Sequence, residues 1–265
     1  MYRKFQLREI DSNIFAYNTK RYQEIGESIL KEQAKEIKTK LQSIVVGDGH
    51  ILNGDEIQQN WFPKVECDVF ISHSHKDTGL AVAIAGWLYK EFDLLAFVDS
   101  EIWGNSQDLL KEIDELFCRN DDGNTYDYLR RNQSTSHVYL MLNMALAQMI
   151  DNTECLFFLN TPSSVCLDDI KDSKTLSPWI FSEINLSNIL RLRIPERLSI
   201  TSSYSTGGAL NERANDSMMN HSLDLNNFIS LCSTDIIEWQ RRCDLGCRKK
   251  EALDVLYKMK YRKVL

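Results

Sequence analysis

The sequence has no long basic run and no long hydrophobic run, and both absences narrow the classes of protein that it fits. Its 265 residues carry a formal net charge of −7, whereas a nucleic-acid surface needs a basic face that releases counterions. The most apolar stretch, residues 138–150, is too short to cross a bilayer and contains Asn143 and Gln148. The first nine residues contain no apolar segment typical of a signal peptide. We therefore expect a globular protein with no nucleic-acid partner, no membrane partner and no export.

Metal-ligand spacing is also missing. The seven cysteines are scattered through apolar stretches, and the nearest approach to a metal motif is the weak Cys243-x-x-x-Cys247. An odd number of dispersed cysteines is typical of a reducing compartment, so we expect the cytoplasm. His137 and His221 are isolated in the sequence and are interpreted as structural residues. The sequence therefore predicts no metal site.

The chain is predicted to hold one large domain preceded by an extension. A hydrophobic content of 43% is enough for a core of that size. Between residues 14 and 44, apolar residues recur every three to five positions, which predicts amphipathic helices, with Gly26 as a point of interruption. Turn signals at 47–49 and 53–55 favour a boundary before Pro63. We expect a helical extension at 1–62 and a domain at 63–265. The extension either packs on the domain or serves as an oligomerisation or partner surface.

Three short apolar runs, at 69–71, 94–98 and 155–159, predict strands buried on both faces, as in a parallel sheet covered by helices. Each run is followed by a polar loop, at 72–76, 99–104 and 160–164. Because ligands bind at the carboxyl ends of strands in open α/β sheets, these loops are the predicted edge of a ligand site.

The remaining segments are predicted from periodicity and composition. Helices are expected at 78–89, 106–117, 136–150, after Ser177-Pro178, and at 234–243 and 249–258. A last strand is expected at 222–225. Residues 119–137 have the composition of an exposed insertion, and residues 201–220 that of a long mobile loop.

Three motifs in this order resemble a bacterial Toll/interleukin-1 receptor (TIR) domain of the NAD-cleaving, anti-phage (Thoeris-like) kind. They are residues 68–77, Phe97-Val98-Asp99 with its following loop, and Ser177-Pro-Trp-Ile-Phe-Ser-Glu183. The resemblance covers about residues 64–191 and implies a flavodoxin-like parallel sheet flanked by helices. The sequence departs from the family's usual pattern in three places: the 119–137 insertion, Ile180, where many members have cysteine, and the loop after residue 200.

The resemblance also implies a catalytic residue. In enzymatic members a glutamate in the third motif cleaves the nicotinamide–ribose bond of NAD+, and Glu183 matches it, with Trp179 matching the aromatic residue. The chemistry is reasonable because a cationic leaving group needs little acid catalysis. One carboxylate can stabilise the developing oxocarbenium ion. The alternative for a lone glutamate is a solvated or salt-bridged helix carboxylate.

The other candidate residues lie in the loops. Ser72, His73, Ser74 and Lys76 either satisfy the turn and cap the next helix or hold the phosphates or adenosine ribose of the dinucleotide. Asp99 and Trp103 belong to the loop that the resemblance places at the mouth of the crevice. Trp103 either anchors that loop or offers an exposed flat face to nicotinamide or adenine, and we favour the second.

The expected function is therefore that of an NAD+ nucleosidase or ADP-ribosyl cyclase-like enzyme in bacterial defence signalling. It would release ADP-ribose, a cyclic isomer or another ADP-ribose-derived messenger, with NAD+ as substrate and no further cofactor. The resemblance implies self-association through TIR–TIR contacts and a downstream effector that responds to the product. The alternative is a non-enzymatic TIR adaptor, because fold alone does not distinguish the two. Base hydrolysis of other nucleotides is a third class.

Overall fold

The computed structural model describes residues 1–10, 14–15, 18–34, 45–46, 51–104, 106–165, 173–198, 221–243 and 246–260. The predicted loop at 201–220 lies outside them. The described chain divides into two compact units, one of Met1–Ser28, Glu66–Val98 and Ile150–Leu265 and the other of Ile29–Val65 and Asp99–Met149. Among the described residues, no helix combines the length and the apolar character that a membrane span needs.

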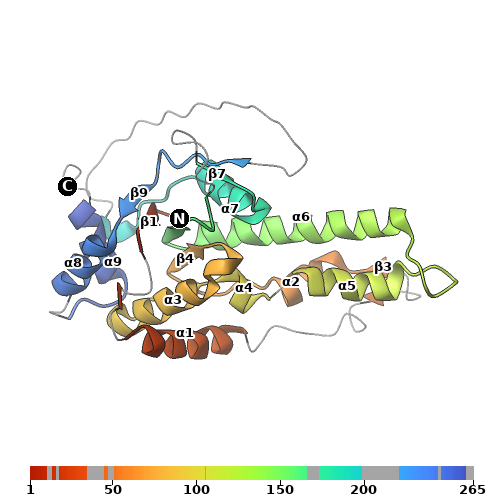
Figure 1. Cartoon of the computed structure of the whole chain (residues 1–265), viewed down its shortest axis with the longest axis horizontal. Coiled ribbons are helices and arrows are strands. Elements are labelled where there is room, and N and C mark those ends of the chain that lie inside the picture. The colour runs from red at the N-terminus through yellow and green to blue at the C-terminus, as the bar shows by residue number, and fades with distance from the viewer. Residues whose placement is uncertain are drawn as a thin grey trace. The chain divides into compact units, whose positions relative to one another are not determined.

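The first unit is an α/β unit built on a five-stranded sheet (Figure 1). Its strands are β1 (Arg3–Arg8), β4 (Val69–Ser72), β5 (Ala96–Phe97), β6 (Cys155–Asn160) and β9 (Ile229–Leu231), in the spatial order β5-β4-β6-β1-β9. Every neighbouring pair is parallel. The predicted strands at 69–71, 94–98 and 155–159 are confirmed as members of one parallel sheet. This arrangement is compatible with a flavodoxin-like fold.

Strand β1 is the main departure from the sequence prediction. Residues 1–62 were expected to form a helical extension, but Arg3–Arg8 pair with β6 on one side and β9 on the other. Residues Met1–Ser28 belong to the same compact unit as the sheet. The sequence prediction relied on continuous apolar runs as the sign of buried strands. Lys4 and Gln6 interrupt such a run around Phe5 and Leu7, although both polar side chains are buried.

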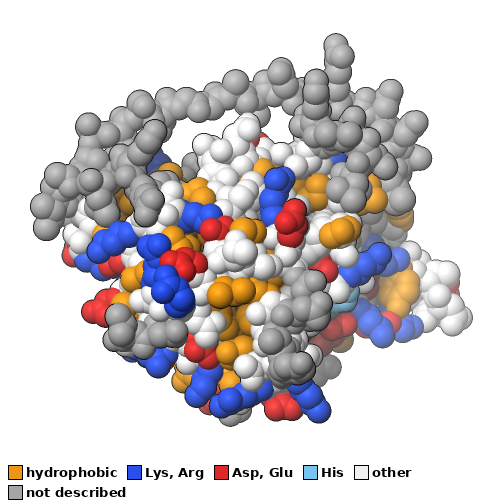
Figure 2. All heavy atoms as spheres, turned by 60° about the vertical axis from the view of Figure 1, so that its left-hand side comes forward, with side chains coloured by type: hydrophobic (Ala, Val, Ile, Leu, Met, Phe, Trp, Pro, Cys, Tyr) orange, Lys and Arg blue, Asp and Glu red, His pale blue; other side chains and the backbone are white. Residues whose placement is uncertain are grey.

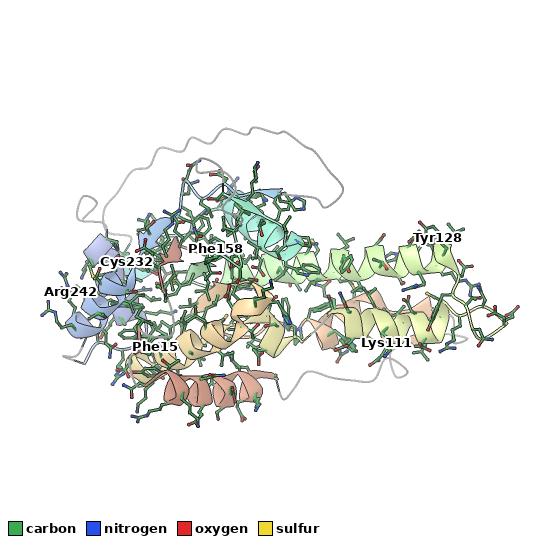
Figure 3. The ribbon with its side chains drawn as sticks, in the orientation of Figure 1. Phe15, Lys111, Tyr128, Phe158, Cys232 and Arg242 are labelled. Atoms are coloured by element: carbon green, nitrogen blue, oxygen red, sulfur yellow. The ribbon has the colours of Figure 1, made fainter. Side chains whose placement is uncertain are left out.

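Helices cover both faces of this sheet. One face carries Phe5 and Phe157, which contact Tyr257 of α9 (Lys250–Lys260) and Trp239 of α8 (Ser233–Cys243). Trp239 also contacts Trp87 and Phe92 of α3 (Thr78–Phe92), so α3, α8 and α9 share this face. The opposite face carries Phe158 (labelled in Figure 3), which is buried and contacts Phe228 edge-on. This face is covered by α7 (Pro178–Ile189). The closing helices predicted near 234 and 249 are confirmed.

Helix α1 (Thr19–Ala34) continues through Gly26, which the sequence had indicated as an interruption. A Cβ atom at Gly26 would overlap the Val82 carbonyl oxygen, and one at Gly86 would overlap the Tyr22 carbonyl oxygen. The two glycines therefore allow α1 and α3 to cross with their backbones in contact. At this crossing glycine serves close packing rather than a break.

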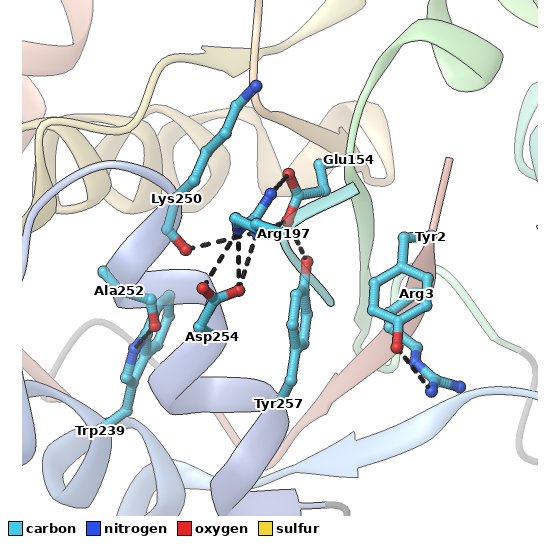
Figure 4. Close-up of polar contacts among 9 residues, drawn as sticks. All are labelled: Tyr2, Arg3, Glu154, Arg197, Trp239, Lys250, Ala252, Asp254 and Tyr257. Carbon is cyan, nitrogen blue, oxygen red and sulfur yellow. Dashed lines mark hydrogen bonds and ion pairs between the residues drawn. The ribbon is translucent and has the colours of Figure 1, made fainter. Parts of the chain in front are cut away.

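A polar network lies at the amino-terminal edge of the sheet (Figure 4). Arg197, in the short turn η4 (Glu196–Leu198), donates to Glu154 and to Asp254 of α9, and the Tyr257 hydroxyl donates to Glu154 Oε1 at 3.0 Å. Nearby is a pocket of about 590 Å³, whose lining includes Arg197 and Glu154 of this network together with Asp68, Arg193 and Lys250. The network fastens α9 to the edge of the sheet that faces away from the predicted ligand site.

A second, two-stranded sheet pairs β7 (Lys174–Thr175) with β8 (His221–Ser222) in antiparallel register. The last strand predicted at 222–225 therefore overlaps β8 by one residue and does not join the parallel sheet. The parallel sheet instead receives β9, whose three residues are too few for a periodicity signal.

The second unit contains the antiparallel strands β2 (Val45–Val46) and β3 (Ile51–Leu52). It also contains the helices α2 (Gly54–Trp61), α4 (Asp99–Ile102), α5 (Ser106–Phe117) and most of α6 (Tyr128–Asn152). Helix α6 begins eight residues before the predicted Ser136, because the Asp127 carboxylate accepts from the Arg130 N–H and caps it. The predicted insertion is therefore a tight turn followed by the exposed start of a helix.

On the face shown in Figure 2, acidic and basic side chains are interspersed.

Candidate active site

The candidate site lies at the carboxyl end of β4. All four residues of this strand are buried, and Ser72, its last residue, is fully buried. Ser72 is in register with Phe158 of β6, whose side chain lies on the face covered by α7. Because side chains at paired positions of neighbouring strands point to the same face, Ser72 faces α7.

Helix α7 brings Glu183 to the same point. Ser177 caps the helix by accepting from the Ile180 N–H at 3.3 Å, and Pro178 occupies its first turn, as the sequence predicted. Glu183, in the middle of the helix, is 2% exposed. The Ser72 hydroxyl donates to Glu183 Oε2 at 2.5 Å. A buried carboxylate requires such partners, so the first and third motifs of the sequence meet in one hydrogen bond.

The turn after β4 satisfies much of its own backbone. Ser74 caps the short turn η3 (His75–Asp77) by accepting from the Lys76 N–H at 3.4 Å. His73 is buried, with Nε2 3.4 Å from the Thr78 hydroxyl, and Lys76 is exposed. These contacts match the turn-and-cap interpretation of Ser74. The predicted ligand contacts of Ser72, His73, Ser74 and Lys76 stay predictions.

Asp77 ties this turn to the loop after β6. Its carboxylate accepts from the Thr161 hydroxyl at 2.5 Å and from the Ser164 hydroxyl at 3.4 Å. Two of the polar loops that the sequence predicted at one edge are therefore joined directly. Asp77 was not proposed for any role, although its place between a strand and a helix is a usual position for such an anchor.

The sequence did not indicate a polar row that β1 and β6 add to this face. Lys4 Nζ donates to the Ser187 carbonyl oxygen of α7 at 3.2 Å and to Asn188 Oδ1. Asn160, the last residue of β6, donates to Gln6 Oε1 at 3.0 Å. Burial lowers the pKa of Lys4 to about 8, against the smaller opposing effect of Asp224. Lys4 and Gln6 escaped notice because residues 1–62 were assigned to the extension, whereas Asn160 belongs to the polar loop predicted at 160–164.

Trp103 differs from its prediction. The side chain was expected at an exposed loop tip, but it is 2% exposed, donates from Nε1 to the Pro63 carbonyl oxygen at 2.9 Å and packs edge-on against Phe62. These contacts make it the anchor of its segment, which was the alternative interpretation. Indole N–H groups that are buried ordinarily find such an acceptor.

Asp99 begins α4 and, with Trp103, belongs to a different compact unit from Glu183. Their joint participation in one site stays a prediction. Trp179 lies in the first turn of α7 and is partly exposed. It is on the same helix as Glu183, one turn before it.

The assembled group is a buried carboxylate held by a hydroxyl at the carboxyl edge of a parallel sheet. Such a group can accept hydrogen bonds from ribose hydroxyls or stabilise a nearby cation. Among the described residues, no cluster of three or more His, Cys, Asp or Glu side chains could hold a metal ion. No protein-family model, curated protein or solved structure matches the chain.

Proposed function

We propose that the chain is a TIR-type enzyme that cleaves the nicotinamide–ribose bond of NAD+ in the cytoplasm, with Glu183 as the catalytic residue. The observation that supports this most is the hydrogen bond from the Ser72 hydroxyl to the Glu183 carboxylate. It joins two of the three motifs that carry the family resemblance, at the sheet edge where α/β proteins bind ligands.

The proposed reaction separates nicotinamide from the ribose C1′ atom, and the bonding electron pair leaves with the neutral nicotinamide. The positive charge then lies on the ribose, where an adjacent carboxylate stabilises it. Ile180 and Ile184, both fully buried beside Glu183 on α7, exclude water from the carboxylate and so reduce screening of its charge. Ser72 acts as a positioning residue that holds one carboxylate oxygen.

The product depends on which nucleophile captures the ribosyl cation. Water gives ADP-ribose, whereas attack by the adenine ring gives a cyclic isomer, and either could serve as a signal to an effector in anti-phage defence. Mass spectrometry of NAD+ incubated with concentrated protein detects cleavage and identifies the product in one measurement.

Glu183→Gln tests the assignment. Glutamine keeps the shape and can still accept from Ser72, but it removes the negative charge that faces the ribosyl cation. We expect turnover to fall at least a hundredfold, since one preorganised electrostatic group is worth about 3 kcal/mol or more. NAD+ affinity should change far less because the ground-state ribose is neutral.

Glu24→Gln is the matched control, because Glu24 is an exposed carboxylate on α1. It should leave turnover unchanged. Retained turnover in a folded Glu183→Gln protein would contradict the catalytic assignment and leave Glu183 as a structural carboxylate. A wild-type protein that never cleaves NAD+, even when concentrated, would favour the non-enzymatic adaptor.

A further inference from the structure

Arg8 lies at the same sheet edge as the Ser72–Glu183 pair. It is the last residue of β1, it is exposed, and it pairs in register with Asn160 of β6. No carboxylate in the described parts of the chain forms an ion pair with it. The guanidinium is therefore available to an anion that approaches this edge.

The side chain of Arg8 shares the face of Glu183. Successive side chains of a strand alternate between faces, so Lys4, Gln6 and Arg8 point the same way. Lys4 donates to the Ser187 carbonyl oxygen of α7 and Gln6 accepts from Asn160, which fixes this as the face covered by α7. Arg8 thus extends the row of buried polar groups to the exposed rim of the sheet.

The spacing suits one extended ligand. β6 lies between β4 and β1, with Phe158 in register with both Ser72 and Gln6. With neighbouring strands about 4.8 Å apart and a rise of about 3.3 Å per residue, the Cα atoms of Ser72 and Arg8 are about 12 Å apart. The long Arg8 side chain covers part of that distance, and Asn160 lies between the two positions.

The backbone holds Arg8 in place. The next residue, Glu9, has a φ of 54°, so the strand turns sharply after Arg8. The Ser233 hydroxyl donates to the Glu9 carbonyl oxygen at 2.9 Å, which fastens this turn to the beginning of α8. Pairing with β6 on one side of Arg8 and this anchor on the other fix where the side chain starts.

We propose that Arg8 binds the pyrophosphate of the dinucleotide whose nicotinamide ribose lies at Glu183, with the Gln6–Asn160 amide pair between them. This assignment rests on the proposed function. A guanidinium suits the task because its planar set of N–H donors can bind two phosphate oxygens at once.

Kinetics of Arg8→Gln with two substrates test the assignment. With NAD+, KM should rise at least tenfold, with a smaller change in kcat, because the lost contact is made equally in the ground and transition states. Nicotinamide riboside carries no phosphate, so the KM of the variant for this substrate should rise far less. Arg8→Lys, which keeps the charge, should recover part of the affinity for NAD+.

Arg21→Gln is the matched control, since Arg21 is an exposed arginine on α1 of the same unit. It should behave as the wild type with both substrates. Equal KM values for NAD+ in wild type and a folded Arg8→Gln protein, checked by thermal melting, would overturn the assignment of Arg8 while leaving the proposed reaction intact.

Calorimetry with ADP-ribose separates the two proposals. If the wild type does not cleave NAD+, the proposed function fails, but a tenfold or larger loss of ADP-ribose affinity in Arg8→Gln still supports a phosphate site. Equal affinities of the two proteins, or an equal loss in Arg21→Gln, would overturn it.

Discussion

Lys4 shows how one buried cation connects β1 to the helix that carries Glu183. Its ammonium group donates to the Ser187 carbonyl oxygen, one of the last carbonyls of α7, and lies 5.0 Å from the centre of the Phe228 ring. A cation at a helix carboxyl end is favourable for the helix dipole. Burial of a charge opposes this gain, and the lowered pKa of Lys4 reflects the balance.

The pH dependence of stability tests this account. Because the pKa of Lys4 falls from 10.5 in the unfolded chain to about 8 in the folded protein, the unfolded state binds more protons between these values. The free energy of unfolding of the wild type should therefore rise, relative to that of Lys4→Met, as pH increases from about 8 to 10.5. Below pH 8 the difference should be constant.

Urea unfolding of both proteins at several pH values measures this difference. Parallel curves from pH 7 to 10.5 would mean that Lys4 titrates as an exposed lysine. The comparison with Lys4→Met matters because tyrosines and other lysines titrate in the same range and are common to both proteins.

At the scale of elements, the crossing of α1 and α3 gives the sharpest prediction. Gly86→Ala places a Cβ against the Tyr22 carbonyl oxygen, so the helices must move apart. We expect a loss of about 1–3 kcal/mol in the free energy of unfolding, as for other overpacked sites.

Gly79→Ala is the control within the same helix, because a Cβ there meets no atom within 4 Å. Alanine is the better helix former, so this variant should gain up to about 1 kcal/mol. Urea unfolding of both variants measures the change in the free energy of unfolding, which we expect to be negative for Gly86→Ala and positive for Gly79→Ala. Stabilisation by Gly86→Ala would contradict the close crossing.

The elements also show what the sequence could predict. β4, β5 and β6 were found because each is a continuous apolar run between turn signals, and such a run at a strand's position has few alternatives. β1 was missed because Lys4 and Gln6 occupy buried positions, and their partners Ser187 and Asn160 are distant in the sequence. No local pattern reports a hydrogen bond of that kind.

The candidate site likewise contains residues that the sequence predicted and residues that it did not. Ser72 and Glu183 were both predicted from motifs, and their hydrogen bond joins them. Asn160 opens the polar loop that the sequence predicted at this edge, whereas Arg8 carries no motif, so only the register of β1 with β6 assigns Arg8 to it. Trp103 was misjudged because a neighbouring glycine indicated a loop tip, whereas the acceptor at Pro63 and the ring of Phe62 bury it.

At the scale of the whole molecule, the family resemblance predicts that activity depends on assembly. The loop after Asp99 in one copy would help to close the site of its neighbour, and head-to-tail contacts of this kind extend into filaments. We expect specific activity with NAD+ to fall steeply as the protein is diluted. Constant specific activity across a wide dilution series would make this prediction wrong.

The interior place of β1 in the sheet, between β6 and β9, bears on how the chain folds. Gln6 and its partner Asn160 are 154 residues apart, and β9, the other neighbour of β1, comes later still. On the ribosome, β1 cannot pair with its neighbours until β6 and then β9 have been synthesised. Contacts so distant in sequence slow folding and prolong the lifetime of aggregation-prone intermediates that expose apolar surface. The protein should therefore depend on chaperones more than its size alone would indicate.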